Sequence, residues 1–453
     1  MTWLTLAQVA ELLNAPLHAV SAEVAQQIAL EKVERDSRAA QQGDLFLALK
    51  GERFDAHEFV SQIVGKASAA LVSTPLDAAI PQIVVPDVRL ALGQLAKYWR
   101  QQFKQPVLGL TGSNGKTTLK EMLTAILSQQ GQTLATMGNL NNDIGVPLTL
   151  LRLRPEDQFA VIEMGANHFG EIDYLTQMAL PDVAILNNAG AAHLEGFGDI
   201  AGVARAKGEI FAGLAADGVA VINADDTYVD YWRTLNKERR LLSFGFAASA
   251  DLRGELTADN QLVIYKGADS VAVRLKLLGR HNQLNALAAA AGASALDIPL
   301  AVIKQGLESL QSVKGRLSPK QGKHGGLVID DTYNANPSSA AAAIAVLAEQ
   351  QGRTILVLGD MGELGTTGEQ LHFAIGQTAK AAKIDEIYTL GRLSAAASQA
   401  FGVGAYAFQD LAELLAALTP NLTANTQVLV KGSRSARMER VVDALTEQGA
   451  ATC

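Results

Sequence analysis

Hydrophobic and polar positions follow different patterns in three successive parts of the chain. In the first part, apolar runs of strand length occur at residues 45–49, 69–73 and 83–85. Short apolar runs bounded by turn residues predict buried strands, and three prolines lie close to the end of this segment. We therefore expect a small N-terminal α/β domain over residues 1–86. The alternative is that the segment only begins a larger domain.

Strands and helices alternate over residues 87–315. Near-continuous apolar runs lie at residues 107–111, 159–163, 183–187 and 219–223. Such runs are typical of parallel strands that are buried on both faces of a sheet. After the first run, one apolar stripe has the spacing of an amphipathic helix and consists of Leu119, Met122, Leu123, Ile126 and Leu127. Alternation over residues 252–277 predicts antiparallel strands, so we expect a central domain with a mostly parallel sheet.

The sequence Gly315–Pro319 marks a second boundary. Beyond it, apolar runs separated by helical stretches occur at residues 327–330, 355–358, 386–390 and 428–431. This order predicts a doubly wound, Rossmann-like α/β domain over residues 316–453. The expected fold class is therefore α/β, with three domains along the chain.

Composition and charge narrow the class of protein. Of the 453 residues, 48% are hydrophobic, which excludes disorder as the main state. The chain has 38 basic and 46 acidic residues, and the resulting net charge of −8 argues against a basic nucleic-acid-binding face. The single cysteine, Cys453, allows no internal disulfide and suggests a reducing compartment. No apolar run approaches the roughly 18 residues of a membrane helix, and the first residues do not resemble a signal peptide. We expect a cytoplasmic monomer without membrane insertion.

A glycine-rich segment, Thr111–Thr118, lies between the first central strand and its amphipathic helix. Glycines let backbone N–H groups turn toward phosphate oxygens, a lysine reaches the β- and γ-phosphates, and a following threonine binds Mg²⁺. Leu110 stands where the strict pattern has glycine, and a short motif also occurs in ordinary turns. Its position between strand and helix nevertheless predicts ATP or GTP binding. The expected nucleotide contacts are Gly112, Ser113, Asn114, Gly115, Lys116, Thr117 and Thr118.

Three further residues are candidates for metal binding or catalysis. Glu163 ends an apolar strand, at the sheet edge where α/β proteins bind ligands, so it is a candidate Mg²⁺ ligand. The alternative for Glu163 is a surface or capping role. His193 follows the next strand, and its spacing leaves a structural or a functional role open. Composition alone favours a solvated helix face for Lys207.

These residues, together with later segments, resemble the Mur ligase family of ATP-dependent amino-acid and peptide ligases. The later segments are Arg280–Leu287, Gly315–Leu317 and Asp330–Pro337. The resemblance spans essentially the whole chain, and further segments narrow it: Asp36–Arg38, Leu47–His57, Gly138–Pro147, His193–Gly198 and Lys431–Ser435. They imply addition of D-alanyl-D-alanine to UDP-N-acetylmuramoyl-tripeptide through an acyl phosphate, the last cytoplasmic peptide addition in peptidoglycan precursor synthesis.

The resemblance also implies roles that spacing does not give. Lys207 is expected to be carbamylated by CO₂ and, with His193, to hold a second Mg²⁺, which reverses the solvated interpretation; with Lys116 these are the expected catalytic residues. Asn282 is expected beside the adenine, whereas Arg316 and Asp331 would reach ATP when the C-terminal domain closes. The N-terminal domain would bind the UDP-sugar. The expected substrate contacts are Ser37, Arg38, Lys50, Gly51, Arg53, Asp55, His57, Asn139, Asn142, Asn334, Asn336, Lys431, Ser433 and Arg434.

Two alternative functions differ in their sequence requirements. A folylpolyglutamate synthase shares the ATP chemistry, but the N-terminal unit with residues 50–57 disfavours it. A P-loop switch or motor ATPase would leave residues 330–337 and 431–435 without a role. The sequence leaves open whether the tripeptide ends in diaminopimelate or lysine.

Overall fold

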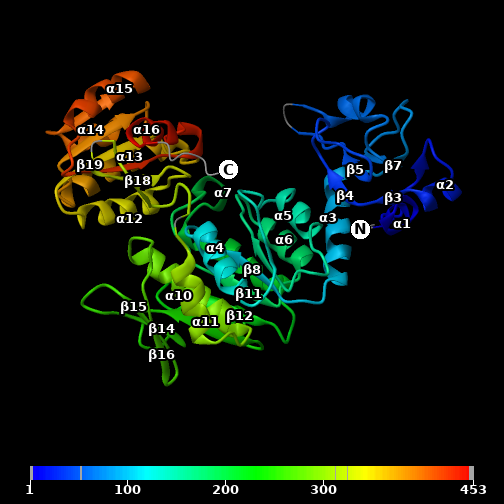
Figure 1. Cartoon of the computed structure of the whole chain (residues 1–453), viewed down its shortest axis with the longest axis horizontal. Coiled ribbons are helices and arrows are strands. Elements are labelled where there is room, and N and C mark those ends of the chain that lie inside the picture. Colours follow the sequence, from blue (N-terminus) through cyan, green and yellow to red (C-terminus); the bar gives the residue numbers. More distant parts are fainter. Residues whose placement is uncertain (1–3, 52–53, 312, 324, 448–453) are drawn as a thin grey trace.

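The computed structural model describes residues 4–51, 54–311, 313–323 and 325–447. Within these residues, three large sheets follow one another along the chain, with the central sheet between the other two (Figure 1). The predicted α/β fold class is confirmed. The sheets lie at residues 17–84, 107–273 and 318–431, inside the three predicted ranges, and the domain boundaries themselves stay predictions.

The N-terminal sheet contains the three predicted strands, β5 (Asp44–Leu47), β6 (Ala69–Val72) and β7 (Gln82–Val84), as parallel neighbours. Every residue of β5 and β6 is buried, which explains their continuous apolar runs. The outer strands are the short β2 (Leu17–His18) and β4 (Lys32–Glu34). The remaining elements are β1 (Leu4–Thr5), β3 (Ala29–Leu30), α1 (Leu6–Leu12), α2 (Ala22–Gln27) and the 3₁₀ helix η1 (Ala56–Ile63).

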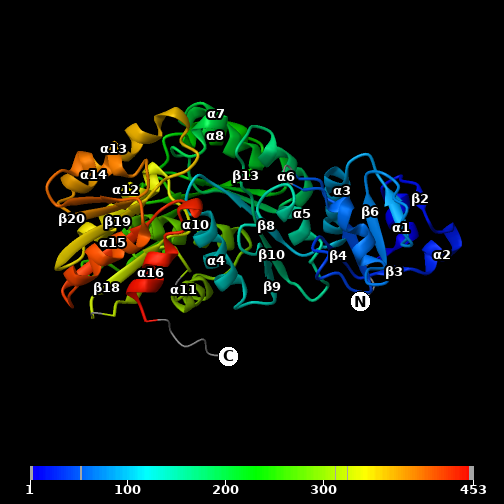
Figure 2. The ribbon, with the colours of Figure 1, turned by 90° about the horizontal axis from the view of Figure 1, so that it is seen from above.

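Helix α3 (Val88–Gln102) joins the N-terminal domain to the central domain (Figure 2). It begins at Asp87, whose carboxylate accepts hydrogen bonds from the first turn, as an N-cap should. Its apolar face, including Leu92 and Leu95, belongs to one hydrophobic core that extends from Leu6 to Trp232. Because both domains contribute to this core, they are packed as one unit.

The central sheet has the order β16-β15-β14-β13-β12-β11-β8-β10-β9. Its strands are β8 (Val107–Thr111), β9 (Thr133–Ala135), β10 (Phe159–Glu163), β11 (Val183–Leu186), β12 (Val219–Asn223), β13 (Arg240–Gly245), β14 (Leu252–Leu256), β15 (Leu262–Lys266) and β16 (Asp269–Val273). Pairing is parallel from β9 to β14 and antiparallel from β14 to β16, as expected. Since β8 lies between β10 and β11, the ends of these strands bring Thr111, Glu163 and Asn187 to one edge.

Helices cover both faces of the central sheet. One face packs against α4 (Lys116–Leu127), α10 (Arg280–Ala295) and α11 (Leu300–Ser309). The other packs against α3, α5 (Gly145–Leu150), α6 (Glu171–Ala179) and α8 (Ile200–Gly208). The remaining elements are α7 (Leu194–Phe197), η2 (Glu209–Gly213) and α9 (Val229–Leu235). This two-sided burial explains the apolar runs of the parallel strands.

The C-terminal sheet has the order β17-β18-β22-β19-β20-β21 and is parallel apart from β17. Its strands are β17 (Ser318–Gln321), β18 (Leu327–Asp331), β19 (Arg353–Gly359), β20 (Glu386–Leu390), β21 (Ala405–Phe408) and β22 (Thr426–Lys431). The helices and 3₁₀ turns are α12 (Pro337–Ala348), η3 (Gly365–Thr367), α13 (Gly368–Ala381), α14 (Ala395–Phe401), α15 (Leu411–Leu418), η4 (Thr419–Asn421), η5 (Arg434–Ala436) and α16 (Glu439–Leu445). They form two apolar cores, one on each side of the sheet. Among the described helices, none is long and apolar enough to cross a membrane.

Candidate nucleotide site and interdomain cavity

The phosphate-loop segment places a helix N-terminus at the edge of the central sheet. Gly115 is the N-cap of α4 and has a φ of 78°, and a Cβ there would lie 2.3 Å from Asn285 Oδ1, so the position requires glycine. Within the described chain, the backbone N–H groups of Gly115, Lys116, Thr117 and Thr118 have no hydrogen-bond acceptor. Free N–H groups at the positive end of a helix form an anion site.

The preceding part of the loop is held by Asn188. Its backbone oxygen accepts from Ser113 N at 3.1 Å, and its side chain accepts from Asn114 N at 2.9 Å and donates to Asn114 O at 3.1 Å. The Ser113 hydroxyl also accepts from Gly190 N at 2.9 Å. Thus the N–H groups of Ser113 and Asn114 fix the loop and do not face the anion site.

Lys116 lies folded over the loop. Its Nζ donates to Gly112 O at 2.7 Å, and burial lowers its pKa. Glu163, which is 2% exposed at the end of β10, partly opposes the lowering of the Lys116 pKa through its negative charge. Its Oε1 accepts from Asn141 Nδ2 at 2.8 Å and lies 3.5 Å from Thr117 Oγ1.

The second oxygen of Glu163 has no polar partner among the described residues. An unpaired buried carboxylate oxygen is costly unless something binds it. Together with the nearby Thr117 hydroxyl it offers the hard oxygen ligands that Mg²⁺ prefers. The donor set therefore fits the predicted metal.

Lys207 is 1% exposed, so the solvated position that composition favours is wrong. Its Nζ donates to Ala166 O at 3.3 Å and lies 5.3 Å from the centre of the Phe197 ring. Burial, followed by the charge of Lys116, lowers the pKa of Lys207 to about 7. The Phe197 ring also contacts His193 edge to face, at 6.5 Å between ring centres. Phe197 thus contacts both of the residues that are expected to hold a second metal.

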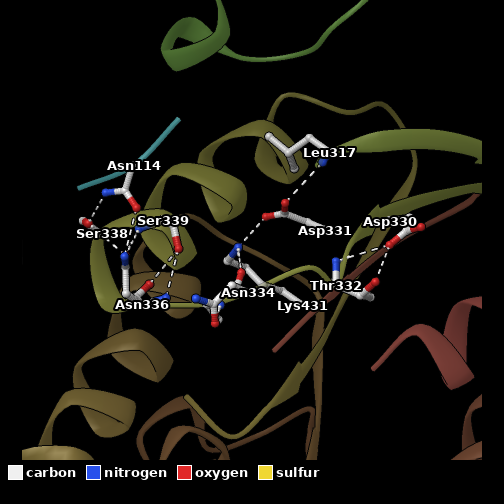
Figure 3. Close-up of polar contacts among 11 residues, drawn as sticks. Asn114, Leu317, Asp330, Asp331, Thr332, Asn334, Asn336, Ser338, Ser339 and Lys431 are labelled. Carbon is white, nitrogen blue, oxygen red and sulfur yellow. Dashed lines mark hydrogen bonds and ion pairs between the residues drawn. The ribbon is translucent and has the colours of Figure 1, made fainter. Parts of the chain in front are cut away.

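Residues after the second domain boundary reach the phosphate loop. Arg316 Nη2 donates to Thr117 Oγ1 at 3.2 Å, and the guanidinium stacks 4.0 Å from the Tyr333 ring centre. Asp331 forms a buried 2.6 Å ion pair with Lys431 Nζ, which also donates to Asn334 O at 3.0 Å (Figure 3). Lys431 is therefore paired within the protein.

A chain of amides that sequence reasoning missed connects the loop to Asn282. Asn187 Nδ2 donates to Asn114 O at 3.0 Å and to Asn285 Oδ1 at 2.8 Å. Asn285 Nδ2 then donates to Asn282 Oδ1 at 3.2 Å, and Asn282 Nδ2 to Leu278 O at 2.7 Å. The available signal was the Asn pair directly after the apolar run of β11.

The side chain of Asn114 crosses to the C-terminal domain. Its Nδ2 donates to Ser338 Oγ and its Oδ1 accepts from Asn336 Nδ2, both at 2.9 Å (Figure 3). Asn336 is the N-cap of α12, and its Oδ1 accepts from Ser339 N at 2.8 Å. The phosphate loop is thereby joined to the start of a helix in another domain.

A cavity of about 680 Å³ lies between the His193 loop of the central domain and the C-terminal domain. Five predicted site residues line it: His193, Asn334, Asn336, Ser433 and Arg434. Glu363 and Arg437 also line it and were not predicted. His193 Nδ1 lies 2.8 Å from Glu363 Oε2 across the domain boundary.

The predicted UDP-sugar residues lie in the N-terminal domain and do not line this cavity. His57 contacts Asp55 Oδ1 through Nδ1 at 2.5 Å and accepts from Ser73 N through Nε2 at 2.8 Å. Arg38 pairs with Asp36. Ser37, Lys50 and Gly51 lie in the same domain, whereas Arg53 lies outside the described residues.

The predicted muramoyl-peptide residues lie between β9 and α5. Asn142 Oδ1 accepts from Gly145 N at 2.9 Å, so its side chain supports the start of α5. Asn139 O accepts from Asn141 N at 2.8 Å, next to the Glu163 contact. Both positions therefore lie within two residues of Asn141, whose side chain contacts Glu163.

Comparison with known proteins adds independent information. Residues 110–293 match the protein family described as "Mur ligase middle domain". Residues 315–434 match the family described as "Mur ligase, glutamate ligase domain". The chain is 49% identical over 465 residues to the UDP-N-acetylmuramoyl-tripeptide–D-alanyl-D-alanine ligase of Escherichia coli (strain K12), covering 100% of both chains.

Solved structures agree with this similarity. A crystal structure of MurF from Acinetobacter baumannii is 43% identical with a TM-score of 0.91, and 98% of each chain is covered. A MurF ligase from Thermotoga maritima in complex with ADP is 29% identical with a TM-score of 0.83, covering 91% of this chain and 96% of that one.

Proposed function

The chain belongs to the Mur ligase family, and from this premise we propose how its site works. The protein is an ATP-dependent ligase that adds D-alanyl-D-alanine to UDP-N-acetylmuramoyl-tripeptide in peptidoglycan synthesis. The observation that carries this function is the similarity over the full length of both chains, N-terminal domain included. Neither the folylpolyglutamate synthase nor the motor alternative is favoured.

The first task of the site is to activate a carboxylate, which is a poor acylating agent. Transfer of the γ-phosphoryl group of ATP to the tripeptide carboxylate yields an acyl phosphate and ADP. Negative charge spreads over the phosphoryl oxygens during transfer, so preorganised positive groups lower the barrier. The four free N–H groups at the start of α4 would bind the phosphates, and Lys116 would turn from Gly112 O to the γ-phosphate.

The second task is to hold metal ions and the nucleotide. Thr117 and Glu163 would hold one Mg²⁺, and His193 with a carbamylated Lys207 a second one. Bound Mg²⁺ supplies further positive charge to the phosphoryl oxygens. Because burial lowers its pKa to about 7, a far larger fraction of Lys207 is neutral near pH 7 than for an ordinary lysine, and the neutral amine would add to CO₂ and release one proton to form the carbamate anion. Asn282 would contact the adenine, and Arg316 and Asp331 would approach ATP from the C-terminal side.

The third task is amine capture. The dipeptide would occupy the interdomain cavity, with Asn334, Asn336, Ser433 and Arg434 as contacts, and its amine would attack the acyl phosphate and expel inorganic phosphate. The UDP-sugar would bind to the N-terminal domain, and Asn139 and Asn142 would face the muramoyl-peptide. Because ATP is a cytoplasmic metabolite, we place the enzyme in the cytoplasm. The monomeric state stays an expectation.

Substrate-dependent ADP release tests this function. The enzyme should release ADP over many turnovers only when ATP, the UDP-tripeptide and D-alanyl-D-alanine are all present, and mass spectrometry should detect the UDP-pentapeptide. Offering the diaminopimelate and lysine tripeptides in competition identifies the preferred one. ATP hydrolysis that continues unchanged without either peptide substrate would contradict a ligase.

A further inference from the structure

Glu363 lines the interdomain cavity on the connection between β19 and α13. Its side chain is 64% exposed, and its backbone has a left-handed φ of 60° between Gly362 and Gly365. A non-glycine residue in this region costs free energy and is found where the surrounding structure requires it. His193, which Glu363 contacts, also has a left-handed backbone conformation, with a φ of 52°. Two unfavourable backbone conformations thus place this carboxylate against the central domain.

The charges around the cavity are mixed. Of the described residues that line it, Glu363 is the acidic one, whereas Arg434 and Arg437 are basic. Arg437 also has a left-handed backbone, with a φ of 52°. A free dipeptide is a zwitterion of about 7 Å, from two residues at about 3.5 Å each. A cavity of about 680 Å³ accommodates it, and the charges match both of its ends.

We propose that Glu363 binds the free amino group of the incoming dipeptide and selects acceptors with an unmodified N-terminus. This inference rests on the proposed function and assigns one contact within it. Since Glu363 lies 2.8 Å from His193 of the central domain, it is on the side of the cavity that faces the phosphate loop's domain. An amine held there is directed toward the acyl phosphate.

The test compares two ligands that differ only at the amino group. N-acetyl-D-alanyl-D-alanine keeps the carboxylate but has no basic nitrogen, so it serves as a competitive inhibitor. In Glu363→Gln, the KM for D-alanyl-D-alanine should rise about 10- to 100-fold, the range for a hydrogen bond to a charged group. The Ki of the acetylated dipeptide should stay within about twofold, as should the KM values of ATP and the UDP-tripeptide.

Two further variants serve as controls. Glu369→Gln removes the same charge from the exposed first turn of α13, outside the cavity lining, and should change none of these constants. Glu363→Asp keeps the carboxylate on a residue that tolerates left-handed backbone. This variant should still bind D-alanyl-D-alanine more tightly than the acetylated dipeptide. The comparison with Glu363→Gln then separates the effect of the charge from that of the backbone conformation.

Three results would overturn the inference. If Glu363→Gln weakens both ligands equally, the residue shapes the cavity. If kcat falls while the KM for the dipeptide is unchanged, Glu363 acts by orienting His193. If both the KM for the dipeptide and kcat are unchanged in Glu363→Gln, Glu363 has no role in dipeptide binding or turnover. Wild-type enzyme that turns over ATP continuously at the same rate with and without the dipeptide would instead refute the proposed function itself.

Discussion

The two hydrogen bonds of Asn114 to α12 allow the closed arrangement of the C-terminal domain to be weakened in steps. Ser338→Ala removes one of these interdomain bonds, together with the 3.0 Å bond from Ser338 to Asn336 within the C-terminal domain, and Asn114→Ala removes both interdomain bonds. A neutral hydrogen bond contributes about 0.5–1.5 kcal/mol net. Ser338→Ala should therefore weaken closure by about 1 kcal/mol and Asn114→Ala by about 2 kcal/mol.

These energies translate into the affinity for the dipeptide, because closure forms one wall of the cavity. Since about 1.4 kcal/mol is a factor of ten, the KM for D-alanyl-D-alanine should rise about fivefold in Ser338→Ala and about 25-fold in Asn114→Ala. In the double variant the Ser338 effect should disappear, which gives a coupling energy of about 1 kcal/mol. Small-angle scattering should show a larger radius of gyration in the same order.

Ser339→Ala is the matched control. Its hydroxyl bonds Asn336 N and O, both at 3.0 Å, within the C-terminal domain, so α12 loses part of its cap but no interdomain bond. The KM for the dipeptide should then change less than twofold. A coupling energy near zero would refute the reasoning. So would an increase confined to the KM for ATP, because Asn114 would then act on the nucleotide alone.

Three other predictions concern single residues. Lys116→Ala should lower ADP release in the complete reaction by at least 10²–10³-fold; near-normal release would exclude its phosphate role. Lys207→Met removes an amine whose pKa burial lowers to about 7. Between this value and the unfolded value near 10.4, the Lys207 proton is bound mainly in the unfolded chain, so the contribution of Lys207 to wild-type stability rises with pH. In CO₂-free buffer the variant should therefore be more stable than wild type at pH 7 in urea titrations, with a gain that shrinks toward pH 10; a constant gain would contradict this. In Gly279→Ala the new Cβ would lie 2.6 Å from Val346 Cγ2 at a φ of 91°. Its unfolding free energy should fall by more than the ~1–2 kcal/mol expected for Gly267→Ala, where the φ is 60° and no atom lies within 4 Å; equal losses would contradict the steric reason.

Burial decides which strands the sequence reveals. The runs at β8, β10, β11 and β12 are visible because helices cover both faces of the sheet. By contrast, β9 has three residues, and β13 starts with exposed Arg240, so neither has a recognisable pattern. Their pairing depends on neighbours that are distant in sequence.

The same distinction applies to the site. The phosphate loop and Glu163 can be predicted from the sequence because they lie at the ends of recognisable strands. The end of a strand fixes where the next residues lie. The bonds from Asn187 to Asn114 of the loop and to Asn285 exist only after three elements have packed. Composition placed Lys207 in solvent because its cover, the Phe197 ring, comes from a different helix.

The domain boundaries differ in the kind of contact they make, and this determines where motion can occur. The N-terminal and central domains share one apolar core through α3. Separating these two domains would therefore expose a large hydrophobic surface to water. The C-terminal domain instead contacts the central domain through Leu278, Val346 and a few polar bonds, including Arg316 to Thr117. Because each such polar bond contributes about 1 kcal/mol, bound substrates can shift the equilibrium between open and closed forms. We therefore expect the proposed nucleotide and dipeptide sites to be linked through closure of this boundary, whereas the proposed UDP-sugar site would stay fixed relative to the phosphate loop.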